Sequence, residues 1–202
     1  MQIDFYFDPV CPWCWITSRW ITEVSEHRDL DLTWRPFSLA IKNDPEDSKD
    51  YRPAHEWGLR GLRIIEAVRR EAGEAAVARV YTEFGARKHN DGLDFPDHAD
   101  VLDTVGLDRT LAAAADDESW DSVIRESMDA ALELAGDDVG VPTIVYQGRT
   151  AFFGPVISPA PTGDAAVRLW DSLATLATTT DGFFELKRTR EVGPIFGERP
   201  QP

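Results

Sequence analysis

The chain has 202 residues, a length that suits one domain or one domain carrying a folded insertion. Its residues are 43% hydrophobic and 10% aromatic, a composition that builds a core and excludes an intrinsically disordered chain. Acidic residues outnumber basic ones by 36 to 21. The formal net charge of −15 therefore disfavours partners such as nucleic acid and anionic membrane surfaces.

The cysteine content narrows the possibilities further. Two cysteines are too few for a disulfide-rich scaffold, and a zinc site would need two further ligands, which the four histidines do not offer at a paired spacing. No apolar run approaches the roughly 20 residues of a membrane-spanning helix. The N-terminus lacks the basic and apolar regions of a signal peptide, so we expect a cytoplasmic protein. In that compartment a close cysteine pair is more often catalytic than structural.

The first 37 residues predict a strand, a helix and a second strand. Residues 3–7 form an apolar and aromatic run that indicates a buried strand. A helix is expected from residue 12 to about residue 26, and residues 30–37 alternate as a strand does. Two strands joined by a helix imply a parallel pair. The inner face of the predicted helix carries Ile16, Trp20 and Val24.

The middle of the chain, residues 44–138, shows helical patterns and no convincing strand. A short helix is expected over residues 97–105, and residues 112–115 are an alanine run that favours helix. Three longer helical faces are predicted: Leu62, Ile65 and Val68; Val77, Val80, Tyr81 and Phe84; and Trp120, Val123, Ile124, Ser127, Ala131 and Leu134.

Strand signals return after the helical block. Residues 143–146 and 150–153 flank a short loop that contains glycine, which is typical of a hairpin. A final helix is predicted over residues 163–178, and the chain from residue 185 onward is expected to be irregular. The order is therefore βαβ, helical insertion, ββα, which indicates an α/β fold.

The motif Cys11-Pro12-Trp13-Cys14 carries the chemistry. At a helix N-terminus, free backbone N–H groups and the positive end of the helix dipole stabilise a thiolate at Cys11. Cys14 lies one turn further in and can attack a mixed disulfide formed on Cys11. Pro12 suits the first helical position, where its missing N–H costs nothing. We expect Cys11 to attack and Cys14 to resolve, the alternative being two buried, inert cysteines.

A second feature is a proline that directly precedes a predicted strand. In Gly140-Val141-Pro142-Thr143, a cis bond before Pro142 would turn the backbone of Val141 toward the thiol. That backbone would then pair with a substrate chain as an added strand does. The alternative is an ordinary trans proline at the start of a strand.

These features resemble the thioredoxin superfamily and its DsbA-like branch, in which a helical domain interrupts the fold and a Val-Pro loop faces Cys-x-x-Cys. The sequences of residues 7–20 and 183–188 are similar to those of the actinobacterial mycothiol-dependent reductases, the mycothiol-dependent nitroreductase family. The resemblance implies a thioredoxin-like domain of residues 1–43 and 138–190. It also implies a helical insertion domain of residues 44–137 and an irregular tail of residues 191–202.

The resemblance also implies a function. It predicts a cytoplasmic thiol–disulfide oxidoreductase that binds no cofactor permanently and uses mycothiol, or a similar small thiol, as its reducing co-substrate. Its partners would be small thiols, disulfides or electrophiles, with nitroaromatic compounds as side substrates and protein disulfides as a further class. Either a monomer or a homodimer is compatible with it.

Four further site residues follow from the resemblance, each with a plainer alternative. Trp13 would form a wall beside the reactive sulfur, or simply pack on its helix. Asn43 would lie at the thiol-binding cleft, or occupy a turn before Asp44. His89 would lie at the cleft between the domains, or cap a helix. Tyr51 would line the same cleft.

Two other functions remain open at this point. Enzymes like glutathione transferase kappa and hydroxychromene-carboxylate isomerase share the architecture but activate a thiol cofactor, and they commonly carry Ser where this chain has Cys11. They need no second cysteine, so Cys14 weighs against this alternative. The other alternative is a chaperone or binding module that uses the cleft without redox chemistry.

Overall fold

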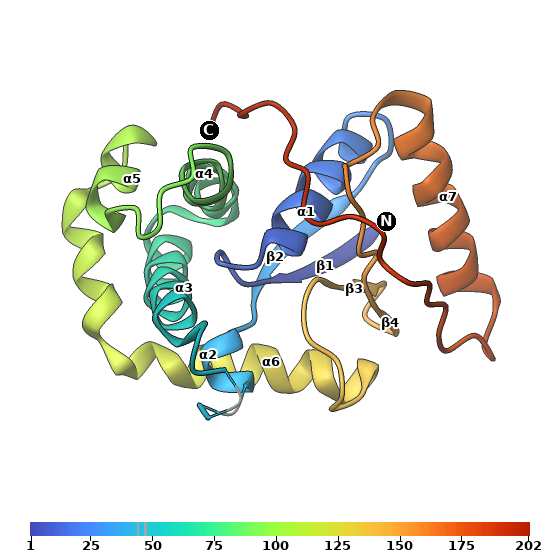
Figure 1. Cartoon of the computed structure of the whole chain (residues 1–202), viewed down its shortest axis with the longest axis horizontal. Helices are drawn as coiled ribbons and strands as arrows, with labels where there is room; N and C mark the ends of the chain where they lie inside the picture. The colour runs from blue at the N-terminus through green and yellow to red at the C-terminus, as the bar shows by residue number, and fades with distance from the viewer. Residues whose placement is uncertain (44, 47) are drawn as a thin grey trace.

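A computed structural model describes residues 1–43, 45–46 and 48–202. Its centre is a four-stranded sheet in the order β2-β1-β3-β4 (Figure 1). Strand β1 (Gln2–Phe7) pairs in parallel with β2 (Asp31–Pro36), and helix α1 (Pro12–Ser25) joins them. Strands β3 (Thr143–Tyr146) and β4 (Thr150–Phe153) form the antiparallel hairpin, and β3 pairs antiparallel with β1. The predicted α/β order is confirmed.

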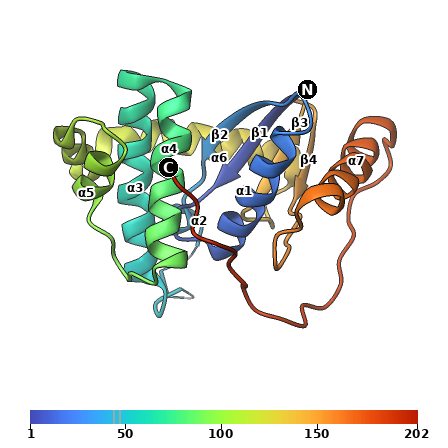
Figure 2. The same ribbon diagram turned by 90° about the horizontal axis from the view of Figure 1, so that it is seen from above.

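Helices cover both faces of this sheet. Helix α1 and helix α7 (Gly163–Thr179) lie on one side, and helix α6 (Asp121–Ala135) crosses the other (Figure 2). The indole of Trp20 donates a hydrogen bond of 3.1 Å to the carbonyl of Ala166, and its ring packs against Trp170. Because Trp20 is fully buried, this contact joins α1 to α7 through the core.

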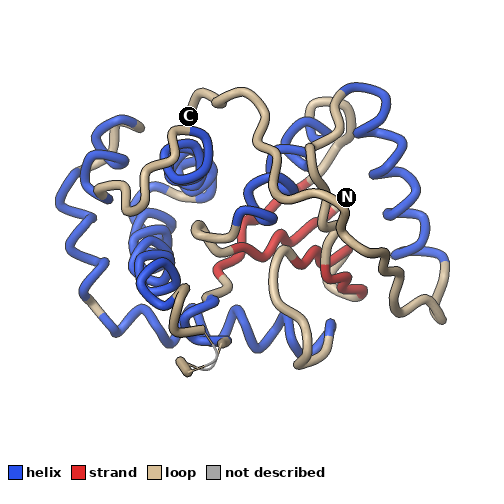
Figure 3. Tube along the Cα trace, in the orientation of Figure 1, coloured by secondary structure: helices blue, strands red, loops and turns tan. Residues whose placement is uncertain are grey.

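The remaining helices lie beyond the edge strand β2, where the tube drawing shows the block of helices beside the sheet (Figure 3). This confirms the helical character expected for the middle of the chain. The division into domains stays a prediction, and its boundary at Asp44 lies outside the described residues. The elements are α2 (Leu39–Lys42), α3 (Arg52–Ala72), α4 (Glu74–Gly85), the π-helical turn η1 (Ala86–Asn90), α5 (His98–Thr104) and the 3-10 helices η2 (Arg109–Asp116) and η3 (Glu118–Trp120).

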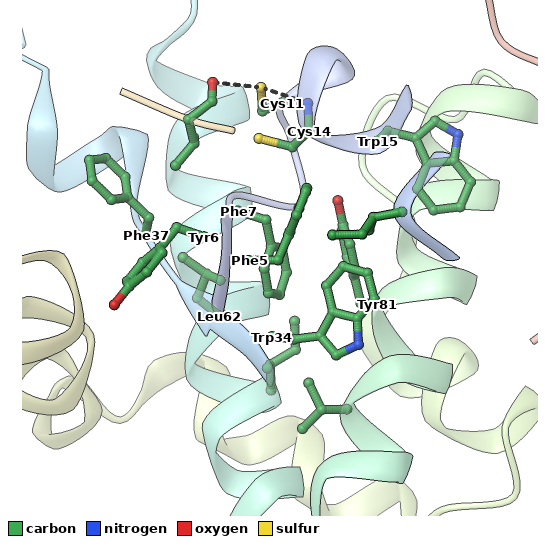
Figure 4. Close-up of a cluster of buried hydrophobic side chains, with 14 of the residues drawn as sticks. Phe5, Tyr6, Phe7, Cys11, Cys14, Trp15, Trp34, Phe37, Leu62 and Tyr81 are labelled. Atoms are coloured by element: carbon green, nitrogen blue, oxygen red, sulfur yellow. Dashed lines mark hydrogen bonds between the residues drawn. The ribbon is translucent and has the colours of Figure 1, made fainter. Parts of the chain in front are cut away.

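Aromatic side chains fill the junction between the sheet and the helical block (Figure 4). The ring of Tyr81, on α4, lies 4.0 Å from that of Phe7 and 5.3 Å from that of Trp34, measured between centroids. Trp15 of α1 meets the same Tyr81 ring edge-on at 6.0 Å. All four side chains are buried, so the sheet, α1 and α4 share one hydrophobic core.

Side chains from α3 and α4 also satisfy the open edge of β2. Glu74 accepts a hydrogen bond of 2.7 Å from the backbone N–H of Trp34, and Arg69 donates one of 2.5 Å to the Trp34 carbonyl. Arg69 also pairs with the buried carboxylate of Glu66. An edge strand normally offers its free N–H and C=O groups to other chains, and here side chains of the helices occupy those of Trp34.

Three sequence expectations need correction. On α6, Val123 and Leu134 are exposed and the buried residues are Ile124, Met128 and Ala131, because the helix presents a narrower face to the sheet than the pattern implied. Residues 112–115 belong to the 3-10 helix η2 rather than to an α-helix. The second strand is shorter than predicted, since its ends are taken up by loops.

Candidate active site

The two cysteines occupy the start of α1. Cys11 is the residue that caps the helix, and its sulfur accepts a hydrogen bond from the backbone N–H of Cys14 at 3.3 Å (Figure 4). The sulfur of Cys11 is therefore aimed at the free N–H groups of the first turn, where negative charge is stabilised. Both residues are free cysteines; Cys11 is 5% exposed and Cys14 is fully buried.

Burial separates the two thiols chemically. The pKa of Cys14 is raised well above its usual value, mainly by burial and further by the hydrogen bond and charge of Cys11. A thiol that is buried and protonated is a poor first nucleophile, so the raised pKa of Cys14 disfavours it as the attacking cysteine.

A buried carboxyl group lies at the base of the motif. Asp8 is fully buried and accepts hydrogen bonds from the backbone N–H groups of Val10 at 3.0 Å and Leu39 at 2.8 Å. Burial raises the pKa of Asp8 to about 7, although these two hydrogen bonds oppose the shift. Its charge also contributes to the raised pKa of Cys14. Asp8 therefore titrates near neutral pH beside the dithiol.

The loop before β3 faces the cysteines. The Val141–Pro142 peptide is cis, and the thiol of Cys11 donates a hydrogen bond of 3.6 Å to the carbonyl of Val141. Residues 130 positions apart in sequence thus meet at the reactive sulfur. The backbone of Val141 is turned toward the thiol in the way the sequence expectation required.

A cavity of about 500 Å³ opens beside Cys11. Of the residues expected at the site, it is lined by Cys11, Pro12, Trp13, Tyr51, His89 and Val141. Pro142 lies directly behind Val141. Asn43 is not among the lining residues: it ends α2, and its backbone N–H donates to the carbonyl of Leu39.

The π-helical turn η1 places His89 in this cavity. The carbonyl of Pro9 can only accept, so the imidazole Nε2–H donates the hydrogen bond of 3.0 Å between them. Burial, with a smaller contribution from the charge of neighbouring Lys88, lowers the pKa of His89 to about 4, although the hydrogen bond to Pro9 opposes the shift. His89 is therefore neutral at pH 7. It connects the helical block to the residues that precede Cys11, rather than simply capping a helix.

Several lining residues were not anticipated from the sequence: Val10, Leu39, Ala54, His55, Lys88, Gly140, Phe153 and Arg190. His55 follows Tyr51 by one helical turn, and their rings stack at 6.3 Å, so helical spacing from Tyr51 offered a signal for it. Asp8 directly follows the predicted first strand, and no local pattern marked it as a site residue. No local pattern marked Arg190, because it lies in the irregular tail.

Other kinds of site receive less support. Within residues 1–43, 45–46 and 48–202, no group of three or more His, Cys, Asp or Glu side chains is arranged to hold a metal ion. None of the helices described there combines the length and hydropathy that a bilayer crossing requires. A second cavity, of about 410 Å³, lies among α3, η2 and η3 and contains neither cysteine.

The thioredoxin-like sheet, the inserted helices and a Cys-x-x-Cys motif opposite a cis-proline loop define a DsbA-like thiol–disulfide oxidoreductase. A family model described as Rv2466c-like, mycothiol-dependent nitroreductase Rv2466c, matches residues 10–188. The chain belongs to this family of mycothiol-dependent nitroreductases.

Individual proteins are also similar to this chain. The uncharacterised protein Rv2286c of Mycobacterium tuberculosis is 32% identical over 198 residues, which cover 96% of this chain and 84% of the relative. Two solved structures share the fold at low identity. The cytosolic disulfide reductase DsbM from Pseudomonas aeruginosa has a TM-score of 0.57 at 17% identity, over 88% of this chain and all of that one. A 2-hydroxychromene-2-carboxylate isomerase has a TM-score of 0.59 at 19% identity, over 87% and 96%.

Proposed function

We propose that this protein is a cytoplasmic reductase that cycles the Cys11–Cys14 dithiol and is regenerated by mycothiol or a similar small thiol. The observation that carries the proposal is the asymmetry of the pair. Cys11 lines a cavity and receives an N–H from the helix start, whereas Cys14 is fully buried behind it. Membership of a mycothiol-dependent family and likeness to a cytosolic disulfide reductase support the co-substrate and the compartment.

The proposed cycle has four thiol–disulfide exchanges, two that oxidise the dithiol and two that reduce it again. The Cys11 thiolate attacks one sulfur of a substrate disulfide, forms a mixed disulfide and releases the first thiolate, which takes a proton from water. Cys14 then loses its proton and attacks the sulfur of Cys11, which releases the second thiolate and leaves a Cys11–Cys14 disulfide. Two molecules of the small thiol reduce this disulfide and leave as their own disulfide, so two electrons pass in each cycle.

The surroundings give the other site residues their proposed roles. Pro12 fixes the first turn of α1, and Trp13 forms a wall of the cavity beside Cys11. Val141 and Pro142 present the carbonyl that contacts the thiol. His89 and Tyr51 line the same cavity. Asn43 would act through α2, whose residue Leu39 lines the cavity. Nitroaromatic compounds are proposed as side substrates because the family is named for their reduction.

The alternative function is that of an isomerase or transferase that only binds a thiol cofactor at Cys11. The fold is compatible with it, since a 2-hydroxychromene-2-carboxylate isomerase shares this architecture. The buried second thiol favours the dithiol cycle, because a transferase has no use for a resolving cysteine. The two functions therefore differ in whether Cys14 is needed.

The first prediction concerns the two cysteine variants. After reaction with mycothiol disulfide or glutathione disulfide, Cys14→Ser should retain one small thiol on Cys11, detected by mass spectrometry of the intact protein. Cys11→Ser should form no adduct, and its mycothiol-linked disulfide reduction should fall to the uncatalysed rate. The wild type should end as the intramolecular disulfide, because Cys14 clears the adduct.

Two results would contradict this proposal. Unchanged reduction by Cys11→Ser would show that the dithiol is not the reactive centre. Full turnover by Cys14→Ser with unchanged dependence on the small thiol would instead support the transferase or isomerase alternative.

A further inference from the structure

The last residues of the chain return to the active site. After α7, the chain passes back across α1 and ends beside α4 (Figures 1 and 2). We call residues 190–199 the return segment. All of it lies beyond residues 10–188, which the family model matches, so membership of the family does not assign it a role.

The return segment is fixed at its far end. Arg199 donates two hydrogen bonds of 3.0 Å to the carboxylate of Glu83, which is 1% exposed, and two of about 3 Å to Asp91. Asn90 donates to the carbonyl of Gly197 at 2.8 Å, and the ring of Phe196 packs on His89. Arg199 binds two carboxylates, and that of Glu83 is buried. This contact therefore holds the end of the chain in place more firmly than an ion pair on the surface would.

The near end of the segment reaches the cavity. The guanidinium of Arg190 lies 5.2 Å from the ring centroid of Trp13 and lines the same cavity as Cys11. This is the geometry of a cation–π contact. In the described part of the chain, no ion pair of Arg190 is found, and the adjacent Glu191 pairs with Arg188 instead.

The cavity differs in charge from the rest of the molecule. Lys88 and Arg190 are its cationic residues, His89 is neutral at pH 7, and none of the described residues that line it is Asp or Glu. Lys88 already contacts the exposed residue Asp94. Of the two cations, the guanidinium of Arg190 is therefore the one with fewer contacts to oxygen atoms and is better placed to bind an anion. In a protein of net charge −15, a cationic cavity concentrates anions locally.

We propose that the return segment is part of the active site and that Arg190 binds a carboxylate of the substrate while Cys11 attacks its disulfide. The inference rests on the proposed reductase function and names its substrate class, namely disulfides that carry a carboxylate near the sulfur. The planar guanidinium donates two parallel hydrogen bonds to a carboxylate, and Trp13 holds it from the other side.

Three small disulfides of similar length test this proposal: 3,3′-dithiodipropionate, bis(2-hydroxyethyl) disulfide and cystamine. They carry two negative charges, no charge and two positive charges respectively. The measurement is the single-turnover rate at which each disulfide oxidises the reduced protein, read by alkylation and mass spectrometry. The wild type should react fastest with the dianion. Arg190→Gln should lower that rate about tenfold, the effect of losing one charged hydrogen-bond partner, and change the neutral rate less than twofold.

A matched control is available two residues away. Arg188 is exposed, pairs with Glu191 and does not line the cavity. Arg188→Gln therefore makes the same change in net charge as Arg190→Gln but removes no cation from the cavity. It should leave the preference for the dianion intact. If Arg188→Gln and Arg190→Gln lowered the rate with the dianion equally, the overall charge of the protein would explain the effect, and the proposal would be overturned.

A second variant tests the anchor. Arg199→Gln frees the far end of the return segment, while Glu83 keeps its ion pair with Arg87 at 2.7 Å and so is not left unpaired. It should reproduce the selective loss seen for Arg190→Gln. A faster reaction with all three disulfides would show that the segment merely covers the cavity, and would overturn the proposal. If the wild type reduced none of them, the reductase function itself would fail, which is a different result.

Discussion

Burial controls the protonation of the groups that surround Cys11. Cys14 and Asp8 are fully buried and both have a raised pKa, whereas His89 is 9% exposed and has a lowered one. In each case the charged form is disfavoured because the protein interior solvates it poorly. Near neutral pH, His89 is therefore neutral and Asp8 is only partly ionised, which leaves the cationic Arg190 of the same cavity to bind an incoming anion.

His89 provides a prediction about stability and pH. Its pKa is depressed to about 4, so its contribution to stability is present above about pH 6.5 and is lost as the pH falls toward 4. His89→Gln keeps a donor for the carbonyl of Pro9 but cannot titrate. The wild type should therefore lose about 2 kcal/mol relative to the variant between pH 7 and pH 4.5.

Urea unfolding of both proteins at the two pH values measures this difference. Asp8 acts in the opposite direction: its raised pKa favours the folded state at low pH, and that benefit is lost as the pH rises through about 7. Because both proteins contain Asp8, its effect cancels in the comparison. A gap between the two proteins that is the same at both pH values would contradict the assignment of His89 as a buried neutral donor.

At the scale of elements, two helices of the insertion approach the motif closely. The π-helical turn after α4 directs Asn90 to the indole of Trp15, with a hydrogen bond of 3.0 Å, and His89 to Pro9. Such turns often occur at functional sites, because the extra residue changes which side chains share a face. Helix α3 approaches from the other side, where Gly58 lies against the carboxyl group of Asp8.

Two glycines of α3 form a matched pair for a packing test. A Cβ at Gly58 would lie 2.3 Å from Oδ1 of Asp8, whereas a Cβ at Gly61 would have its nearest neighbours at 3.7 Å. Gly58→Ala should lower the free energy of unfolding by about 1–3 kcal/mol. Gly61→Ala should leave it unchanged or raise it by up to about 1 kcal/mol, since alanine favours a helix.

Chemical denaturation of both variants tests the packing, and the single-turnover rate tests the site. Gly58→Ala should also slow the reaction of Cys11, because Asp8 holds the backbone of Val10 next to it. If the two variants had equal stability, the close approach of α3 to Asp8 would be wrong.

At the scale of the whole molecule, the helical block is fixed to the sheet through apolar contacts and through hydrogen bonds from a charged side chain. The aromatic cluster around Tyr81 supplies the apolar contact. Arg69 supplies the polar one: its guanidinium donates to the carbonyl of Trp34 on the edge strand, while Glu66 on the same helix balances its charge. This docking places His89, Tyr51 and Lys88 in the lining of the cavity beside Cys11, so the cavity depends on it.

Removing this arginine should loosen the connection. Arg69→Met leaves the buried carboxylate of Glu66 and the carbonyl of Trp34 without that partner, and should cost about 3 kcal/mol of unfolding free energy. Arg79→Met, at an exposed position on α4, is the control and should change stability by less than about 0.5 kcal/mol. Thermal and urea unfolding give both values. Equal stability of the two variants would mean that the contact of Arg69 with Trp34 does not contribute to docking.

Much of the fold could be predicted because its signals are local. The periodicity of Ile16, Trp20 and Val24 and the glycine loop between β3 and β4 depend on neighbours within a few residues. The predicted buried face of α6 was wrong for Val123 and Leu134, which are exposed. Periodicity shows which residues share one side of a helix, but it does not show how much of that side other elements cover.

The sequence by itself determined the reactive group, since a Cys-x-x-Cys motif between a strand and a helix places one thiol at the N–H groups of the first turn. Only the tertiary structure decided what surrounds that thiol. The burial of Asp8, the neutral state of His89 and the position of Arg190 over Trp13 all arise from segments far apart along the chain. Burial and charge depend on which segments pack together in the folded protein, and patterns among neighbouring residues do not show which distant segments these are.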